Sequence, residues 1–213
     1  MLERGLAASR ERAQALVIEG KVLVNEQKVS KPGTAVESGA SLRLLGKELR
    51  YVSRGGLKLE RAIEHWTIDV RGRVCLDAGA STGGFTDCLL QHGAATVIAI
   101  DTGYGQIDLR LRQDARVRLL ERTNARYLKA DDIGEGASLA AVDVSFISAT
   151  LVLPAVVAAA RGGAAAGPLE LVTLVKPQFE VGRARVGKGG IVRQPEAQQD
   201  AVSRVRESVE RLG

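Results

Sequence analysis

Short apolar runs alternate with amphipathic stretches along most of the chain after residue 74. Five runs have the length and composition of buried strands, and they cover residues 74–78, 96–101, 117–120, 139–144 and 169–175. Helical patterns separate most of them, at residues 85–91, 150–160 and 197–212. This order predicts an α/β fold with an open, mostly parallel sheet that carries helices on both faces.

The first fifty residues follow a different pattern. Apolar residues recur at helical spacing over residues 9–19, with Ser9 as a candidate cap and Gly20 as the stop signal. Two strands are expected within residues 21–29 and a third at residues 41–45. One helix and a small sheet predict a compact α+β module.

Two domains follow from this change of pattern. The module is expected to cover residues 1–47, and residues 48–56, where the apolar periodicity lapses, are expected to form a linker. The α/β domain is expected to cover residues 57–213. It opens with a helix that carries Lys58 near its N-terminal end. The apolar side of this helix is expected to contain Leu57, Leu59, Ala62, Ile63 and Trp66.

Composition narrows the class of protein. The longest apolar run covers residues 149–160 and is shorter than the roughly 18 residues that a membrane span requires, so we expect no membrane partner. Cys75 and Cys88 form no C-x-x-C pair, and the chain has 2 histidines, so we expect no metal site and a reduced, cytoplasmic location. We also expect a monomer.

The excess positive charge lies at the N-terminus. Residues 1–60 hold 11 Lys and Arg against 7 Asp and Glu, although the net charge of the whole chain is only +5. No aromatic residue precedes Tyr51, so an RNA partner would be bound through phosphate and shape contacts and not by stacking. The candidate RNA-binding residues are Arg4, Arg10, Arg12, Lys21, Lys28 and Lys31.

A glycine-rich loop, GASTGG at residues 79–84, follows the first long strand. Its beginning matches the G-x-S-x-G nucleophile elbow, but no histidine follows His92 to complete a triad. The G-x-G-x-x-G spacing of a dinucleotide site is also absent. S-adenosylmethionine has a ribose but no phosphate, and Asp101 is placed to bind a ribose diol. A methyl-donor site therefore fits best, and a tight turn without a ligand stays open.

Two more polar residues stand at strand ends. Asp143 follows the fourth strand, and Lys176 follows the fifth. The carboxyl ends of parallel strands meet at one edge of the sheet, so both side chains are expected in the crevice of the glycine loop. Pro177 disfavours a helical conformation at Lys176, which directs that lysine into the cleft.

Six motifs are spread over nearly the whole chain, namely SRGGLK (53–58), LDAGASTGGFT (76–86), RTN (122–124), DVSFIS (143–148), LVKPQFE (174–180) and GGIVR (189–193). They closely resemble the TlyA (haemolysin-A) family of ribosomal-RNA ribose 2′-O-methyltransferases, which are relatives of FtsJ. Residues 1–47 resemble the alpha-L RNA-binding domain, with its usual opening segment shortened. The resemblance implies a Rossmann-like methyltransferase domain that uses S-adenosyl-L-methionine, with ribosomal RNA or ribosomal subunits as the partner.

The resemblance also implies a Lys-Asp-Lys-Glu catalytic tetrad. Lys58, Asp143 and Lys176 match its first three members. The family glutamate lies in a strand after the last helix, so the domain is expected to be C-terminally truncated and to lack it. The family's cofactor contacts map onto Gly79, Ser81, Gly83, Gly84, Asp101 and Asn124.

The implied reaction is an in-line methyl transfer to a ribose 2′-hydroxyl, with a cytidine as the family's target. A neutral Lys176 would act as the base while Asp143 orients both lysines. Two other functions stay open. The chain would act as an RNA- and cofactor-binding protein without turnover if the glutamate is essential. A membrane-active haemolysin would need an amphipathic or spanning segment, which the sequence does not show.

Overall fold

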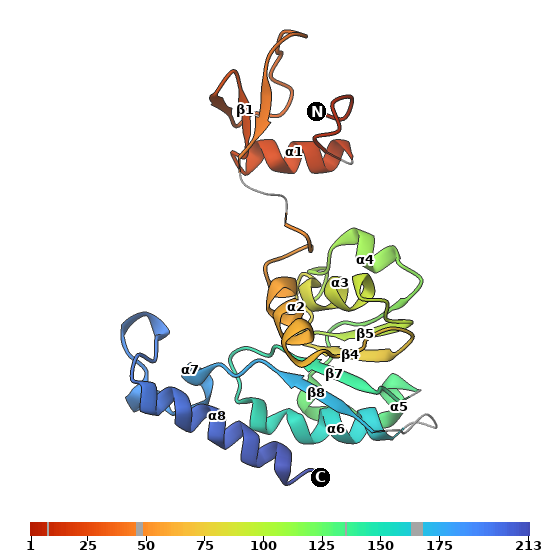
Figure 1. Cartoon of the computed structure of the whole chain (residues 1–213), viewed down its shortest axis with the longest axis vertical. Helices are drawn as coiled ribbons and strands as arrows, with labels where there is room; N and C mark the ends of the chain where they lie inside the picture. Colours follow the sequence, from red (N-terminus) through yellow and green to blue (C-terminus); the bar gives the residue numbers. More distant parts are fainter. Residues whose placement is uncertain (8, 46–48, 135, 163–167) are drawn as a thin grey trace. The chain divides into compact units, whose positions relative to one another are not determined.

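The computed structural model describes residues 1–7, 9–45, 49–134, 136–162 and 168–213, without the side chain of Arg12 (Figure 1). The chain divides into two compact units, Met1–Leu49 and Arg50–Gly213. The domain boundary expected at residues 47 and 48 lies outside the described residues. Each unit has its own hydrophobic core and is described separately.

The first unit packs one helix against a three-stranded antiparallel sheet. Its elements are α1 (Arg10–Ile18), β1 (Val22–Val24), β2 (Gln27–Val29) and β3 (Leu42–Leu44), with the strand order β2-β1-β3. Asn25 and Glu26, the two residues between β1 and β2, both have positive φ angles, as a two-residue type I′ hairpin requires. Leu16, Val17 and Val22 are buried between helix and sheet. The expected helix and strands are confirmed.

The second unit is built on a five-stranded sheet in which every pair of neighbouring strands is parallel. The strands are β4 (Val74–Ala78), β5 (Thr96–Ile100), β6 (Val117–Leu120), β7 (Leu139–Val142) and β8 (Glu170–Thr173), in the order β6-β5-β4-β7-β8. Parallel strands covered on both faces are expected to be continuously apolar. The central strands β4, β5 and β7 are almost entirely buried, which confirms the α/β prediction.

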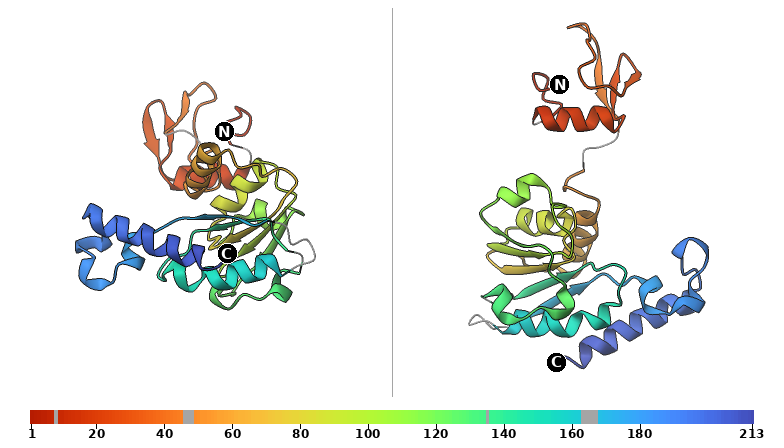
Figure 2. Two further views of the ribbon diagram at one scale, coloured as in Figure 1. Left: turned by 60° about the horizontal axis from the view of Figure 1, so that its bottom comes forward. Right: turned by 180° about the vertical axis from the view of Figure 1, so that it is seen from behind.

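Helices cover both faces of this sheet (Figures 1 and 2). One core contains residues from α2 (Gly55–Trp66), α3 (Gly84–Gln91) and α4 (Leu109–Gln113). The other contains residues from α5 (Ala130–Ile133), α6 (Leu153–Arg161) and α8 (Pro195–Glu210). The remaining helical turns are η1 (Ala125–Tyr127), η2 (Ala149–Leu151), α7 (Pro177–Glu180), η3 (Arg183–Arg185) and η4 (Lys188–Gly190).

The structure adds detail at two places where the sequence pattern is weak. The short helices α4, α5 and α7 were not predicted, because four or five residues are too few to show a helical period. Much of the expected linker belongs to the second unit, since Tyr51 is buried and Gly55 starts α2. A Cβ on Gly56 would lie 2.3 Å from Cγ of Tyr51, so this glycine makes room for the tyrosine ring.

Candidate functional site

The site lies where the sheet reverses its strand order. β4 and β7 are neighbours, although β5 and β6 lie between them in the sequence. The Asp143 N–H donates to the Ala78 carbonyl at 3.0 Å, so the residues that follow β4 and β7 start side by side. Open α/β sheets bind ligands at such a switch point.

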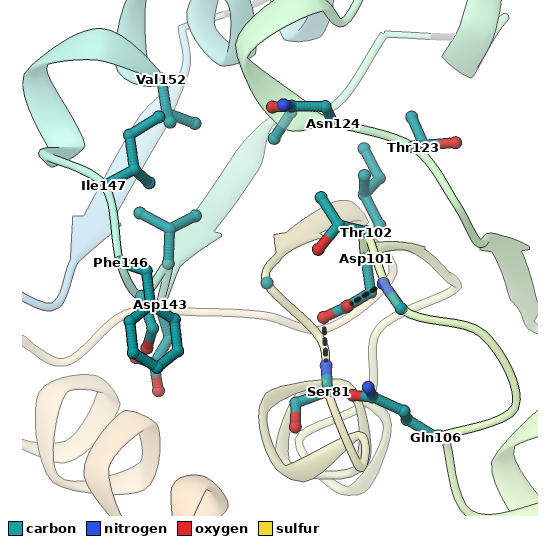
Figure 3. Close-up of a pocket in the computed structure, with 16 residues that line it drawn as sticks. Ser81, Asp101, Thr102, Gln106, Thr123, Asn124, Asp143, Phe146, Ile147 and Val152 are labelled. Atoms are coloured by element: carbon teal, nitrogen blue, oxygen red, sulfur yellow. Dashed lines mark hydrogen bonds between the residues drawn. The ribbon is translucent and has the colours of Figure 1, made fainter.

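The glycine loop after β4 is held against β5. Gly79 has a φ of +95°, and a Cβ there would lie 2.6 Å from the carbonyl oxygen of Asp143. The Ser81 N–H donates to Asp101 Oδ2 at 2.8 Å, and the Gly103 N–H donates to Asp101 Oδ1 at 2.7 Å (Figure 3). Asp101 therefore supports the loop, and its oxygens keep lone pairs for further donors.

A cavity of about 410 Å³ opens at these strand ends. Its polar wall contains Ser81, Asp101 and Asn124, and Ile100, Ile147 and Val152 supply apolar surface (Figure 3). Asn124 Oδ1 already accepts the Arg126 N–H at 3.0 Å, which starts η1. Both the size and the mixed lining are typical of a small-molecule site.

The six residues expected to contact a cofactor fall into two groups in the structure. Gly79, Ser81, Asp101 and Asn124 line the 410 Å³ cavity. The lining of this cavity does not include Gly83 or Gly84, although Gly84 lines a smaller cavity beside it. A Cβ on Gly83 would lie 2.3 Å from Leu111 Cδ1, and one on Gly84 would lie 2.9 Å from the Gly56 N, so both glycines permit close packing of helices.

Several lining residues were not anticipated from the sequence. Thr102 and Gln106 come from the loop after β5, which shows no periodic signal, and Thr123 was anticipated only as a member of the RTN motif. Phe146 was anticipated only as a member of the DVSFIS motif. Its side chain is 93% exposed and its φ is +65°, an unusual conformation for an aromatic residue. The sequence did offer one signal for this residue. Phe146 is an aromatic residue in a motif that begins with Asp143, directly after a predicted strand.

The three expected catalytic residues meet at one carboxylate. Lys176 Nζ lies 2.5 Å from Asp143 Oδ1, and Lys58 Nζ lies 3.5 Å from Asp143 Oδ2. Lys176 also donates to Ser145 Oγ at 2.6 Å. The side chains of Asp143 and Lys176 are 16% and 18% exposed, whereas that of Lys58 is 49% exposed. Two lysines from α2 and from the end of β8 thus share one acidic partner.

A second cavity, of about 200 Å³, lies beside this cluster. Its lining includes Lys58 together with Gly79, Ser81 and Asp143, which also line the first cavity. A molecule bound in one cavity would therefore reach the wall of the other at these three shared residues. This arrangement suits a reaction between two bound molecules.

Asp77 is a buried acid directly below the glycine loop. Its Oδ2 accepts the Thr86 hydroxyl at 2.7 Å, and its Oδ1 has no partner among the described residues. Burial raises the pKa of Asp77 to about 7, and the Thr86 hydrogen bonds oppose this shift. The carboxylates of Asp143 and Asp101 raise the pKa further.

The described residues do not support a serine nucleophile, a metal site or a membrane-spanning helix. Ser81 has a positive φ, but the His92 ring nitrogen lies 2.8 Å from the Cys88 carbonyl at the other end of α3, so the serine has no histidine partner there. Within these residues no cluster of three His, Cys, Asp or Glu side chains suits a metal ion. Nor does any described helix have the length and apolar character to span a membrane.

The basic residues of the first unit differ in their partners. Arg4 donates to the carbonyls of Ala40 and Ser38, and Lys21 pairs with Glu19 at 2.5 Å. Among the others, the side chains of Arg10, Lys28 and Lys31 are exposed, and that of Arg12 lies outside the described residues. The exposed members are free to meet a polyanion.

The fold and the site define an α/β domain with a cavity at the switch point of its sheet, next to a Lys-Asp-Lys cluster. The chain belongs to the FtsJ-like methyltransferase family, whose pattern matches residues 51–212, and residues 1–42 match the S4 domain. The chain is therefore a methyltransferase with an N-terminal S4 domain, as the sequence motifs predicted.

Named relatives cover both units. The chain is 48% identical to the 16S/23S rRNA (cytidine-2′-O)-methyltransferase TlyA of Mycobacterium tuberculosis, over 100% of this chain and 78% of the relative. A candidate rRNA methyltransferase of Bacillus subtilis, YqxC, is 46% identical over 96% of this chain and 72% of the relative. The solved structure of a candidate hemolysin from Streptococcus thermophilus is 43% identical, with a TM-score of 0.70, over 96% of this chain and 74% of that one.

Proposed function

We propose that this chain transfers a methyl group from S-adenosylmethionine to the 2′-hydroxyl of a cytidine ribose in ribosomal RNA. The observation that carries the proposal is the Asp143 carboxylate, which pairs with both Lys58 and Lys176 and belongs to a residue that lines both cavities. The name of the Mycobacterium relative supports cytidine and ribosomal RNA as the target. The S4 match supports RNA as the substrate.

The residues of the larger cavity fit the proposed cofactor. Asp101 can accept hydrogen bonds from a ribose diol, because each of its oxygens uses only one backbone N–H. The apolar side chains of Ile100, Ile147 and Val152 suit an adenine ring. Gly79 keeps the loop backbone packed against the Asp143 carbonyl at the cavity wall, since it carries no Cβ.

The cofactor, when bound, supplies an electrophilic methyl carbon on a sulfonium. The 2′-hydroxyl is a poor nucleophile until its proton is removed, and Lys176 in its neutral form would accept that proton. The Lys58 amine, on the other oxygen of Asp143, would stabilise the developing alkoxide. Asp143 holds both amines within reach, so that the ribose meets a preformed cluster.

Labelled methyl transfer to unmodified ribosomal subunits tests this proposal, with the modified ribose mapped along the RNA. Lys176→Ala is expected to lower the transfer rate at least about 100-fold, because the base is lost, while cofactor affinity changes little. Lys129→Ala provides the matched control, since Lys129 is exposed and lies outside the linings of both cavities.

The outcomes separate the possible functions. Transfer to a single cytidine ribose by the wild-type chain supports the proposal. Cofactor binding without transfer supports a binding protein without turnover and overturns the proposal. Full activity of Lys176→Ala overturns the role of Lys176 and leaves the reaction itself intact.

A further inference from the structure

We infer that Glu180 is a positioning residue that joins the two loops carrying Asp143 and Lys176. The glutamate lies at the end of α7, and only 3% of its surface is exposed. It belongs to the LVKPQFE motif, yet it lines neither cavity, and within the described part of the chain its carboxylate bonds to Ser148 and Ala149 and to none of the three catalytic residues. This inference rests on the proposed function of the Lys-Asp-Lys cluster.

Both carboxylate oxygens of Glu180 are used by the loop after β7. Oε1 accepts the Ala149 N–H at 2.7 Å, and Oε2 accepts the hydroxyl of Ser148. Ser148 in turn contacts the Thr150 hydroxyl at 2.7 Å and caps η2. A buried carboxylate is costly unless it is hydrogen-bonded, so these contacts hold Glu180 in one place.

The segment after β8 therefore contacts the loop after β7 at three successive points. Lys176 reaches the beginning of the loop at Asp143 and Ser145. The Phe179 ring lies 5.6 Å from the ring of Phe146 in the middle of the loop. Glu180 fixes the end of the loop at Ala149.

Without the last of these contacts, the segment after β8 would still contact the loop through Lys176 and the Phe146–Phe179 ring pair, but the end of the loop would lose both of its hydrogen bonds to Glu180. Asp143 and Phe146 would then sample positions away from Lys176. Misplacement of reacting groups by about 1 Å costs on the order of 100-fold in rate. We therefore expect removal of the Glu180 carboxylate to lower the rate of methyl transfer and to leave the fold as a whole intact.

The test compares three variants of the full chain, each normalised to the number of cofactor-binding sites. Glu180→Ala is expected to lower kcat at least about 10-fold and to change the KM for RNA by less than about 3-fold, because the loop loses both hydrogen bonds. Glu180→Gln is expected to stay within about 3-fold of the wild-type kcat, since its amide can bond to Ala149 and Ser148 without a charge. Glu207→Ala removes an exposed glutamate of α8 and serves as the control.

Hydrogen exchange supplies a readout that does not depend on activity. The Ala149 amide and the loop of residues 143–149 are expected to exchange faster in Glu180→Ala and at the wild-type rate in Glu180→Gln. Unchanged exchange in Glu180→Ala overturns the inference, even if the wild-type chain transfers no methyl group. A kcat loss in Glu180→Gln as large as in Glu180→Ala also overturns it, because the charge and not the hydrogen bonding would then matter.

Discussion

Phe146 combines two features that are energetically unfavourable for an aromatic residue. Its ring is 93% exposed, and its backbone has a φ of +65° beside the shared carboxylate of Asp143. Conformational strain of this kind clusters at ligand sites, where the surrounding structure maintains it. Single-stranded RNA bases stack on such exposed aromatic rings.

Replacement of Phe146 tests whether its ring holds the target nucleotide. Stacking of one base contributes about 1–3 kcal/mol, so Phe146→Ala should weaken kcat/KM for RNA by roughly 5- to 150-fold. Phe146→Trp retains a planar ring and should keep most of the activity, whereas Phe146→Leu keeps only apolar volume and should resemble alanine. Equal activity of the tryptophan and leucine variants in steady-state assays would contradict a stacking role.

Asp77 makes stability depend on pH in a defined direction. Its pKa rises from 3.8 to about 7 on folding, so the folded chain holds this proton while the unfolded chain has released it. The contribution is fully present below about pH 4, decreases as the pH rises, and is lost above about pH 7. Each pKa unit corresponds to 1.36 kcal/mol, which gives a total of a few kcal/mol.

Asp77→Asn isolates this contribution, because asparagine has a similar shape and does not titrate. The difference in unfolding free energy between the variant and the wild-type chain should change by a few kcal/mol between pH 4 and pH 7, in favour of the variant at the higher pH. Urea unfolding at several pH values measures it. A difference that does not depend on pH would show that Asp77 has an ordinary pKa.

At the scale of elements, the β4–α3 loop depends on a close approach that only glycine allows. Gly79→Ala adds the strain of a positive φ and a Cβ 2.6 Å from the Asp143 carbonyl. Gly72→Ala is the matched control, since Gly72 also has a positive φ but no atom lies within 4 Å of the added Cβ. The control should lose about 1 kcal/mol of stability and keep its activity.

Gly79→Ala should lose more stability than the control and should also bind the cofactor at least about 10-fold more weakly, because the loop or Asp143 must move. Isothermal titration with S-adenosylmethionine and chemical unfolding of both variants measure the two effects. Equal cofactor affinity in both variants would show that the loop absorbs the added carbon without disturbing the site.

The elements also show why much of the second unit was predictable. Strands β4, β5 and β7 are buried on both faces, so their apolar runs stand out, and the polar residues that follow them mark one edge of the sheet. That logic places Asp101 and Asp143 in the crevice. It cannot identify Thr102 or Gln106 as cavity residues, because irregular loops carry no periodic signal. It also cannot show that Gly83 permits close packing of helices, because that contact depends on the three-dimensional structure.

At the scale of the whole molecule, the proposed function assigns RNA binding to the first unit and methyl transfer to the second. The first unit holds 8 Lys and Arg against 6 Glu and no Asp, while the cavities and the lysine cluster belong to the second. The first unit also has no aromatic residue, which excludes stacking on its surface. RNA affinity and cofactor affinity should therefore change independently of one another.

Charge reversal in the first unit tests this division. The variant Arg10→Glu, Lys28→Glu, Lys31→Glu changes three exposed side chains, and each lost phosphate contact should reduce the salt slope of RNA binding by about 1. RNA affinity at low salt should fall at least about 10-fold, while cofactor affinity and the temperature of unfolding stay near the wild-type values. Filter binding over a range of salt concentrations measures the slope. A variant with an unchanged slope would mean that RNA contacts other residues of the chain, and the basic surface of the first unit would then serve only solubility.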